Sequence, residues 1–133
     1  MRDPLQGYHR HDVTFTVTST ADSTVVSATG SLDSTVAEHL LDRLSDEIAL
    51  RPSALLVDLT RVGFCSARIL RALLVASAEA HAAGIPCAIV SDQHAVRRPI
   101  SLLELDHLLQ VHDNLTAARK WLAVLHEVDV AHQ

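Results

Sequence analysis

The feature that most constrains the fold is a continuous apolar run at residues 54–57, Ala-Leu-Leu-Val, which lies between two amphipathic helical patterns. A run without polar alternation is typical of a parallel strand that is covered on both faces. The flanking patterns extend from Thr35 to just before Pro52 and from Ser66 to Gly84, with apolar residues at three- and four-residue spacing. A buried strand between two helices predicts an α/β fold with a mostly parallel sheet and right-handed crossovers.

The chain before the first helix has the alternation of strands. Residues 13–18 are Val-Thr-Phe-Thr-Val-Thr, and residues 24–32 follow after a short turn, so we predict an N-terminal β-hairpin. Thr35 and Glu38 have capping-box spacing, which predicts the start of the first helix. The later elements that we expect are a strand at 86–90, a short or broken helix at 92–105 around Pro99, a strand at 108–112 and a closing helix capped by Asp113 or Asn114. The predicted order is ββαβαβαβα.

Length and composition predict a single domain with an ordinary core. The chain has 133 residues, 48% hydrophobic but only 3% aromatic, so its core must consist mainly of Leu, Val, Ile and Ala. We assign residues 1–133 to one domain, with the core at 13–125 and loose termini at 1–12 and 128–133. A net charge of -5 argues against a nucleic-acid partner. No stretch is apolar and long enough for secretion or a membrane span, so we expect a cytoplasmic protein that binds no membrane.

The loops at the carboxyl ends of the strands are the expected binding region, because ligands and partners of open α/β sheets meet the chain there. In this chain those loops contain residues 30–33, 60–68 and 91–92. Asp58 marks the predicted end of the buried strand, and the loop after it opens a helix at about Ser66. We expect Ser66 to be an N-cap, at a helix terminus whose free N–H groups favour a nearby negative charge.

Two patterns in this region resemble those of enzymes. Cys65 and Arg71 have the C-x5-R spacing of cysteine phosphatases, but Ile69 and Leu70 fit the buried face of a helix better than a phosphate-binding loop. Asp58 resembles the phosphoacceptor of response-regulator receiver domains, but the first strand does not end in an acidic pair and the only lysine lies inside the final helix. We expect the Asp58 carboxylate to accept local backbone hydrogen bonds instead. We therefore predict no enzyme, no metal and no cofactor.

Four segments in the same order and spacing resemble the STAS family of anti-sigma factor antagonists. These are residues 30–33 (Gly-Ser-Leu-Asp), 55–59 (Leu-Leu-Val-Asp-Leu), 62–70 (Val-Gly-Phe-Cys-Ser-Ala-Arg-Ile-Leu) and 96–106, and the resemblance extends over about 13–125. It implies a protein that binds an anti-sigma factor, itself a serine kinase with a histidine-kinase-like ATPase fold, and so frees a sigma factor for transcription. The family usually has glycine where this chain has Glu104, so we expect a longer or helical corner there.

The resemblance also implies a regulatory site. In the family a phosphorylated serine in the third segment switches binding off, but Ala67 occupies that position here and Ser66 is the possible substitute. Asp33 matches the family's Gly-x-Leu-Asp loop, and we expect it to be the electrostatic anchor of the partner surface. That predicted surface comprises Ser31, Asp33, Arg61, Phe64, Ser66, Ala67, Arg68 and Arg71.

Two further expectations remain open at this point. A divergent STAS module that acts as a scaffold, or as a sensor of a small ligand or nucleotide, is the alternative function. Cys65 precedes a helix N-terminus that is expected to lower its pKa, whereas Cys87 lies in a buried strand. We therefore take Cys65 as the redox candidate and as the more exposed of the two thiols.

Overall fold

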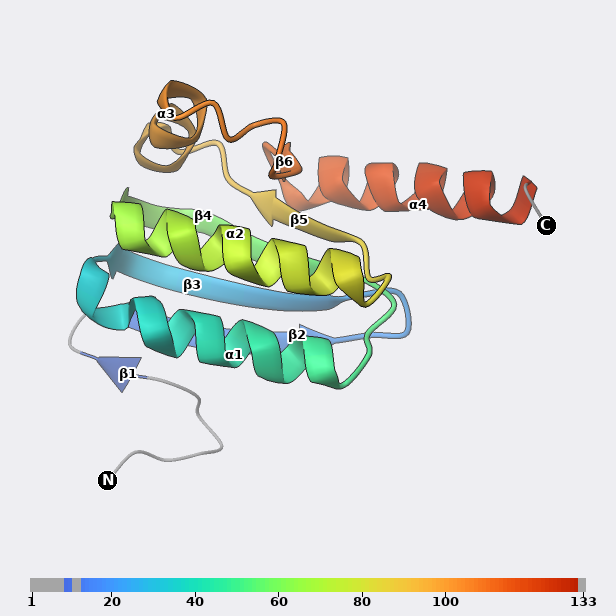
Figure 1. Cartoon of the computed structure of the whole chain (residues 1–133), viewed down its shortest axis with the longest axis horizontal. Helices are drawn as coiled ribbons and strands as arrows, with labels where there is room; N and C mark the ends of the chain where they lie inside the picture. Colours follow the sequence, from blue (N-terminus) through green and yellow to red (C-terminus); the bar gives the residue numbers. More distant parts are fainter. Residues whose placement is uncertain (1–8, 11–12, 132–133) are drawn as a thin grey trace.

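The computed structural model describes residues 9–10 and 13–131, and it has an α/β fold built on one six-stranded sheet (Figure 1). The strands lie in the sheet in chain order, from β1 to β6. The pairs β1–β2 and β2–β3 are antiparallel, whereas β3 to β6 pair in parallel. The predicted α/β class, the N-terminal hairpin and the order ββαβαβαβα are confirmed, with the short β1 added in front.

The strands are β1 (His9–Arg10), β2 (Val13–Ser19), β3 (Thr24–Leu32), β4 (Leu55–Cys65), β5 (Cys87–Val90) and β6 (Val111–His112). The helices are α1 (Ala37–Ala49), α2 (Ala67–Ala82), α3 (His94–Leu102) and α4 (Leu115–Ala131), with a 3-10 turn η1 (Ser34–Val36) before α1. The final strand is shorter than the predicted 108–112, because only Val111 and His112 pair with β5.

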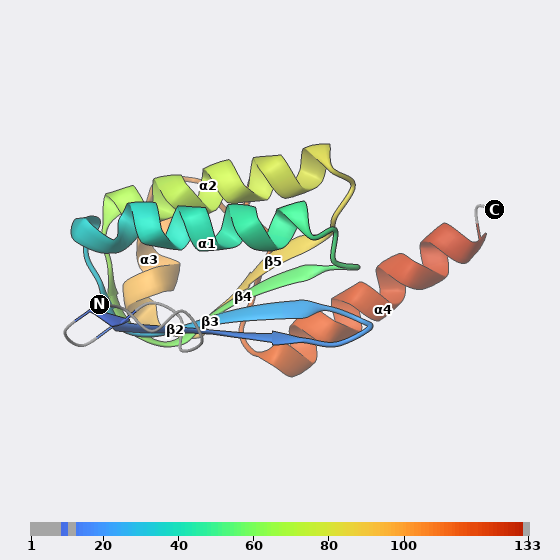
Figure 2. The ribbon, with the colours of Figure 1, turned by 90° about the horizontal axis from the view of Figure 1, so that it is seen from below.

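The sheet separates two apolar layers. Helices α1 and α2 lie side by side on one face, and α4 lies on the other (Figure 2). The larger layer contains Phe15, Leu44 and Leu73, and the smaller contains Val25, Leu56 and Ala118. The apolar run at the start of β4 contributes alternately to both layers, since Leu55 and Val57 belong to the larger and Leu56 to the smaller. This arrangement explains why the run has no polar alternation.

Strand β4 is longer than predicted. It continues past Asp58 to Cys65, so the prediction that Asp58 ends the strand and that a loop follows was wrong. Two register shifts in the pairing with β3 allow β4 to carry extra residues while it still pairs, one between Ser27 and Thr29 and one between Gly30 and Ser31. Gly30 has φ 114° at the second shift, a backbone conformation that favours glycine. The polar and glycine residues that resembled a loop therefore belong to an irregular strand.

The start of the first helical segment also differs from the prediction. Thr35 is not a helix cap, because it lies inside η1 and its backbone N–H donates to the Asp33 carboxylate at 2.9 Å. Helix α1 begins only at Ala37 and has no side-chain cap. The capping-box prediction for Thr35 and Glu38 was therefore wrong, and Asp33 is the residue that caps this segment.

Helices α2 and α3 end in the same backbone motif. After α2, the N–H of Ile85 donates to the carbonyl of Ala80, and Gly84 between them has φ 75°. After α3, the N–H of Leu105 donates to the carbonyl of Ile100 in the same pattern, and Glu104 has φ 55°. These are Schellman caps, which usually place glycine at the left-handed position. The corner at Glu104 is therefore not helical, since α3 ends at Leu102, and a glutamate adopts the conformation that favours glycine.

The chain ends are more ordered than predicted. Residues 9–10 pair with β2, and α4 continues to Ala131, so the prediction of loose termini was wrong for 9–10 and 128–131. Residues 1–8, 11–12 and 132–133 lie outside the described residues. In Figures 1 and 2, α4 extends past the end of the sheet. No helix in the described part of the chain is both long and apolar enough to cross a membrane.

Candidate functional site

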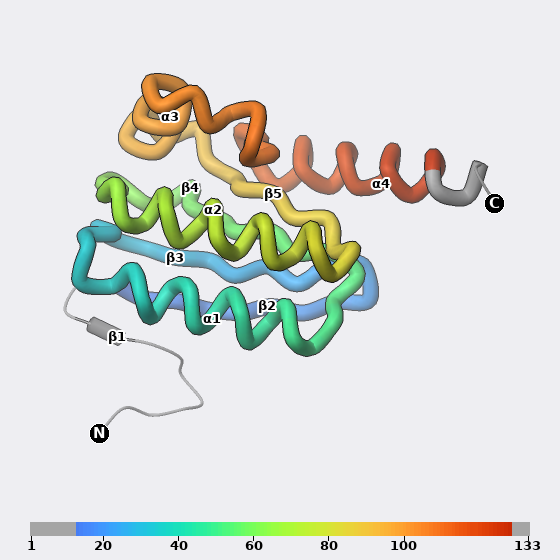
Figure 3. Tube along the Cα trace, in the orientation of Figure 1, coloured from blue at the N-terminus to red at the C-terminus, as the bar shows by residue number. Residues whose placement is uncertain are grey.

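The carboxyl ends of β3 and β4 bring the predicted site residues to one end of the sheet. Ser31 is paired with Phe64 and Leu32 with Cys65 across these two parallel strands. The backbone N–H of Ser66 then donates to the carbonyl of Leu32 at 2.9 Å, which ties the start of α2 to the end of β3. Figure 3 shows that α1 and α2 both begin at this end of the sheet. Residues 31–33 and 64–68, which are far apart in the sequence, therefore form one continuous surface.

Asp33 lies on this surface and has a structural role there. Its Oδ1 accepts hydrogen bonds from the backbone N–H and the hydroxyl of Thr35, so it orders the turn that leads into α1. The side chain is exposed, which leaves it accessible to a partner. Its geometry therefore combines a cap with an exposed negative charge.

Ser66 is the N-cap of α2, as predicted. Its backbone is extended, with φ -76° and ψ 165°, and its Oγ accepts a hydrogen bond from the N–H of Ile69 at 3.4 Å. Ala67, the next residue, is the first residue of the helix and is exposed. Because Ser66 has a non-helical backbone, its hydroxyl is directed toward the first turn of α2, whereas the Ala67 methyl lies on the helix surface.

Cationic side chains and one aromatic ring complete the surface. Arg61 and Phe64 are exposed on β4, and Arg68 and Arg71 are exposed one turn apart on α2. Half of the Phe64 side chain is accessible, with an exposed fraction of 50%, in a chain that contains only two phenylalanines. Exposed aromatic and arginine side chains are the residue types that are enriched in protein interfaces. The arrangement is suited to binding another protein.

Asp58 lies behind this surface at the first register shift of β4. Its Oδ1 accepts hydrogen bonds from the backbone N–H of Thr60 at 3.0 Å and from the Thr60 hydroxyl at 2.7 Å. The expected role as a carboxylate that orders the local backbone is confirmed. Because Asp58 lies within the strand and not at its end, it lacks the position of a receiver phosphoacceptor.

The expectation for the two thiols was wrong. Cys65 is buried with an exposed fraction of 6%, and Cys87 is the more exposed of the pair. Burial raises the pKa of the Cys65 thiol to about 12, although it precedes a helix N-terminus. Desolvation therefore outweighs the helix dipole here. A neutral, buried Cys65 is unsuited to be the thiolate of a cysteine phosphatase beside Arg71. Ile69 is fully buried as a residue of α2, as expected for a helix and not for a phosphate-binding loop.

Sequence reasoning missed one residue that shapes this end of the sheet. The side-chain amide of Gln93 donates to the backbone carbonyl of Thr60 at 3.0 Å. Strand β5 ends at Val90, which pairs with Asp58, so the later part of β4 has no β5 residue beside it. Gln93 satisfies a carbonyl on that free edge. The sequence carries no signal for this bond, because the two residues are 33 positions apart and neither belongs to a motif.

The comparisons with known proteins decide the family. A family model described as "Mlab, STAS domain" matches residues 15–110, which includes every residue of the surface described above. The chain belongs to the STAS family. Anti-sigma-F factor antagonist RsfB of Mycobacterium tuberculosis is 31% identical over 111 residues, which cover 80% of this chain and 90% of RsfB.

Solved structures share the STAS fold. An anti-sigma factor antagonist from Mycobacterium paratuberculosis matches with a TM-score of 0.75 and 27% identity, over 84% of this chain and 94% of that protein. The anti-sigma factor antagonist SpoIIAA in its unphosphorylated form matches with a TM-score of 0.67 and 17% identity, over 80% of this chain and 94% of that protein. The second likeness concerns the fold alone. These matches place the chain among STAS domains over most of its length.

Proposed function

We propose that this STAS domain is an anti-sigma factor antagonist, a non-enzymatic protein that binds an anti-sigma factor and so releases a sigma factor for transcription. The observation that carries the proposal is the similarity over most of its length to antagonists of this kind, including RsfB. The partner would be an anti-sigma factor with the histidine-kinase-like ATPase fold. Because transcription in bacteria takes place in the cytoplasm, the protein would act there.

The proposed binding surface is the one at the carboxyl ends of β3 and β4. Its centre would be Phe64, since exposed aromatic side chains that become buried in an interface often contribute most of the binding free energy. Arg68 and Arg71 on α2 would lie beside it, and Asp33 would supply the negative charge. Mixed charges around an apolar centre favour a partner with a complementary pattern, which gives specificity and register.

Alanine substitution of Phe64 tests this surface. We expect Phe64→Ala to lower the affinity for the anti-sigma factor at least about tenfold, because truncated central aromatic residues typically cost more than 1 kcal/mol. Leu50→Ala is the matched control, since Leu50 is an exposed apolar residue after α1, at the opposite end of that helix from Asp33. Titration calorimetry with the purified anti-sigma factor measures both. Equal affinities for the two variants would contradict the proposed surface.

We also propose that the antagonist has no serine phosphoswitch at the usual position. Ala67 has no hydroxyl, and the Ser66 hydroxyl is half-buried and bonded to the first turn of α2. A phosphate adds nearly two negative charges, so its absence would leave the interface permanently competent to bind. Regulation would then depend on abundance, a competing antagonist or another ligand.

Incubation with the anti-sigma kinase and ATP, followed by intact-mass measurement, tests this point. We expect no change in mass and no loss of binding. A stoichiometric phosphate on Ser66 that abolishes binding would contradict it and would mean that the switch has moved by one residue. Ser66→Ala is the control for this measurement. Ser66 carries the only hydroxyl among residues 64–68, so any phosphate that disappears in this variant was attached to Ser66.

A further inference from the structure

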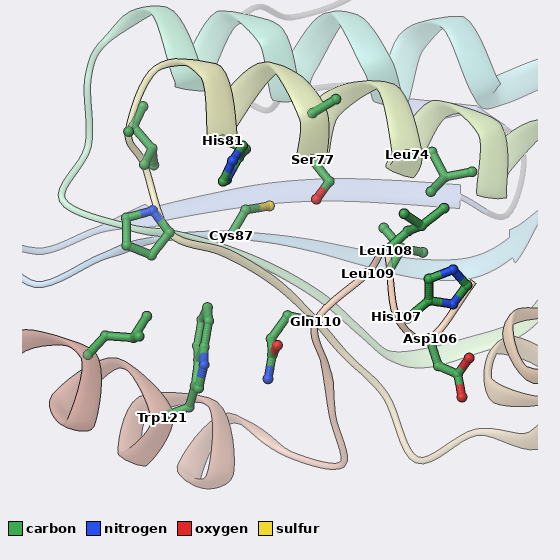
Figure 4. Close-up of a pocket in the computed structure, with 15 residues that line it drawn as sticks. Leu74, Ser77, His81, Cys87, Asp106, His107, Leu108, Leu109, Gln110 and Trp121 are labelled. Carbon is green, nitrogen blue, oxygen red and sulfur yellow. The ribbon is translucent and has the colours of Figure 1, made fainter. Parts of the chain in front are cut away.

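A large groove lies on the free edge of β5, between α2 and α4. Its volume is about 760 Å³, within the range of small-molecule sites. Leu74, Ser77 and His81 of α2 form one wall, and Trp121 and Leu125 of α4 form the other (Figure 4). None of the residues that line it belongs to the proposed partner surface. The groove is therefore a separate feature of the molecule.

The short final strand explains why this groove exists. Strand β6 pairs only with Ile89 and Val90, so Cys87 at the start of β5 has β4 on one side but no strand on the other. The segment 106–110 lines the groove there instead, and the carbonyl of Gln110 at its end accepts a hydrogen bond from the N–H of Ile89 in β5. Cys87 lies on the floor between the two helices (Figure 4). Burial raises the pKa of its thiol to about 12, so the floor carries no negative charge at neutral pH.

The polar groups of the groove have a consistent arrangement. Ser77, His81 and Trp121 each carry a hydrogen-bond donor, and within the described residues none of these three side chains forms a hydrogen bond. In Figure 4 His81 and Trp121 lie toward one end of the groove, Ser77 and Gln110 lie near its middle, and Asp106 and His107 lie toward the other end. Leu74 and Leu109 contribute apolar surface between the ends. Hydrogen-bond donors next to apolar side chains suit a ligand with an acceptor oxygen on an apolar body.

We propose that this groove binds a small aromatic acid, with its ring against Trp121 and its acidic oxygens near Ser77 and His81. An aromatic ring on the indole face gains offset-stacking contacts in addition to apolar burial. Oxygens that carry a negative charge accept stronger hydrogen bonds than neutral ones, and the Ser77 hydroxyl and a His81 ring N–H can donate such bonds. Asp106 at the far end disfavours the reverse orientation.

The chain offers a built-in reporter for this site. Trp121 is its only tryptophan and lines the groove, so its fluorescence reports directly on an occupant. The probe is 8-anilinonaphthalene-1-sulfonate, an aromatic acid whose absorption overlaps tryptophan emission. We expect saturable binding at one site per chain, with quenching of the Trp121 emission. N-phenyl-1-naphthylamine has the same rings without the sulfonate and is the matched neutral probe.

Substitutions on α2 locate the site. Ser77→Phe places a ring in the groove and should lower the affinity for the sulfonate probe at least about tenfold. Val75→Phe adds the same ring at an exposed position of α2 that does not line the groove, and it should bind as the unaltered chain does. His81→Ala should weaken the sulfonate probe by about two- to tenfold and leave the neutral probe unchanged.

Three results would overturn the proposal. Unchanged binding in Ser77→Phe would place the probe elsewhere on the molecule. If His81→Ala lowered the affinity for both probes equally, His81 would not bind the acidic oxygens as proposed. A dimer in sedimentation experiments that Ser77→Phe dissociates would mean that a second copy of the chain, and not a small molecule, covers the groove.

Discussion

Asp33 has two roles in this account, and two substitutions separate them. The side chain caps η1 by accepting the N–H of Thr35, and it is also the proposed negative anchor of the partner surface. Asp33→Ala removes the acceptor and the charge together. Asp33→Asn keeps an acceptor oxygen in the same place, because asparagine is as good an N-cap as aspartate, and removes only the charge.

The two roles predict losses of different size in stability and in binding affinity. Loss of an N-cap costs about 1 kcal/mol, which lowers the melting temperature of a chain of 133 residues by about 4 °C. Loss of a charge that is paired and desolvated in an interface costs about 2 kcal/mol or more, roughly thirtyfold in Kd. We therefore expect Asp33→Ala to lose both stability and affinity. Asp33→Asn should lose the affinity alone and keep the melting temperature of the unaltered chain.

Thermal unfolding and titration with the anti-sigma factor, measured on the same three proteins, decide between the roles. If Asp33→Asn binds the anti-sigma factor as tightly as the unaltered chain does, Asp33 contributes only its cap and not an interface charge. The cap is refuted if Asp33→Ala melts at the same temperature as Asp33→Asn.

Three other predictions concern the body of the fold. Glu104→Gly should raise the free energy of unfolding by about 1 kcal/mol, because glycine relieves the strain of a left-handed conformation. Gly84→Ala should lower it by a similar amount. Denaturant midpoints that move in the same direction for both variants would contradict the Schellman assignment. In the folded protein, iodoacetamide at neutral pH should react slowly with both thiols and faster with Cys87 than with Cys65, whereas a preference for Cys65 in peptide mass spectra would contradict the burial. Burial lowers the pKa of His112 from its ordinary value of 6.5, so the unfolded chain takes up a proton more readily and stability is lost as pH falls through that value. Melting temperatures at about pH 7.5 and about 5.5 should therefore differ less for His112→Asn than for the unaltered chain, and equal differences would exclude this contribution.

The sequence predicted the elements that are defined by apolar periodicity, but not the details that depend on the register between strands. The run at 54–57 and the stripes of α1 and α2 depend on burial, which the residue types record directly. The length of β4 depends on its register with β3, and polar residues such as Thr60 and Arg61 give no local sign that a partner strand holds them. Pairing between distant segments is thus the information that a single pattern lacks.

The candidate surface was predictable in position but not in local chemistry. The family pattern identified Asp33 and the start of α2, and the structure brings them to one end of the sheet. The cap at Asp33 and the high pKa of Cys65 follow from the exact backbone course and burial, which residue types alone do not give. The prediction for Cys65 was wrong for this reason, because a helix N-terminus lowers a thiol pKa only where desolvation does not outweigh it.

The most direct test of the central claim is release of a sigma factor. A preformed complex of the anti-sigma factor with its labelled sigma factor is titrated with this protein, in the presence of ATP, and free sigma factor is measured by fluorescence anisotropy. We predict stoichiometric release that persists for hours, because Ala67 cannot be phosphorylated to reverse it. Sigma factor that stays bound at a large excess of this protein, or release that reverses as ATP is consumed, would contradict the account.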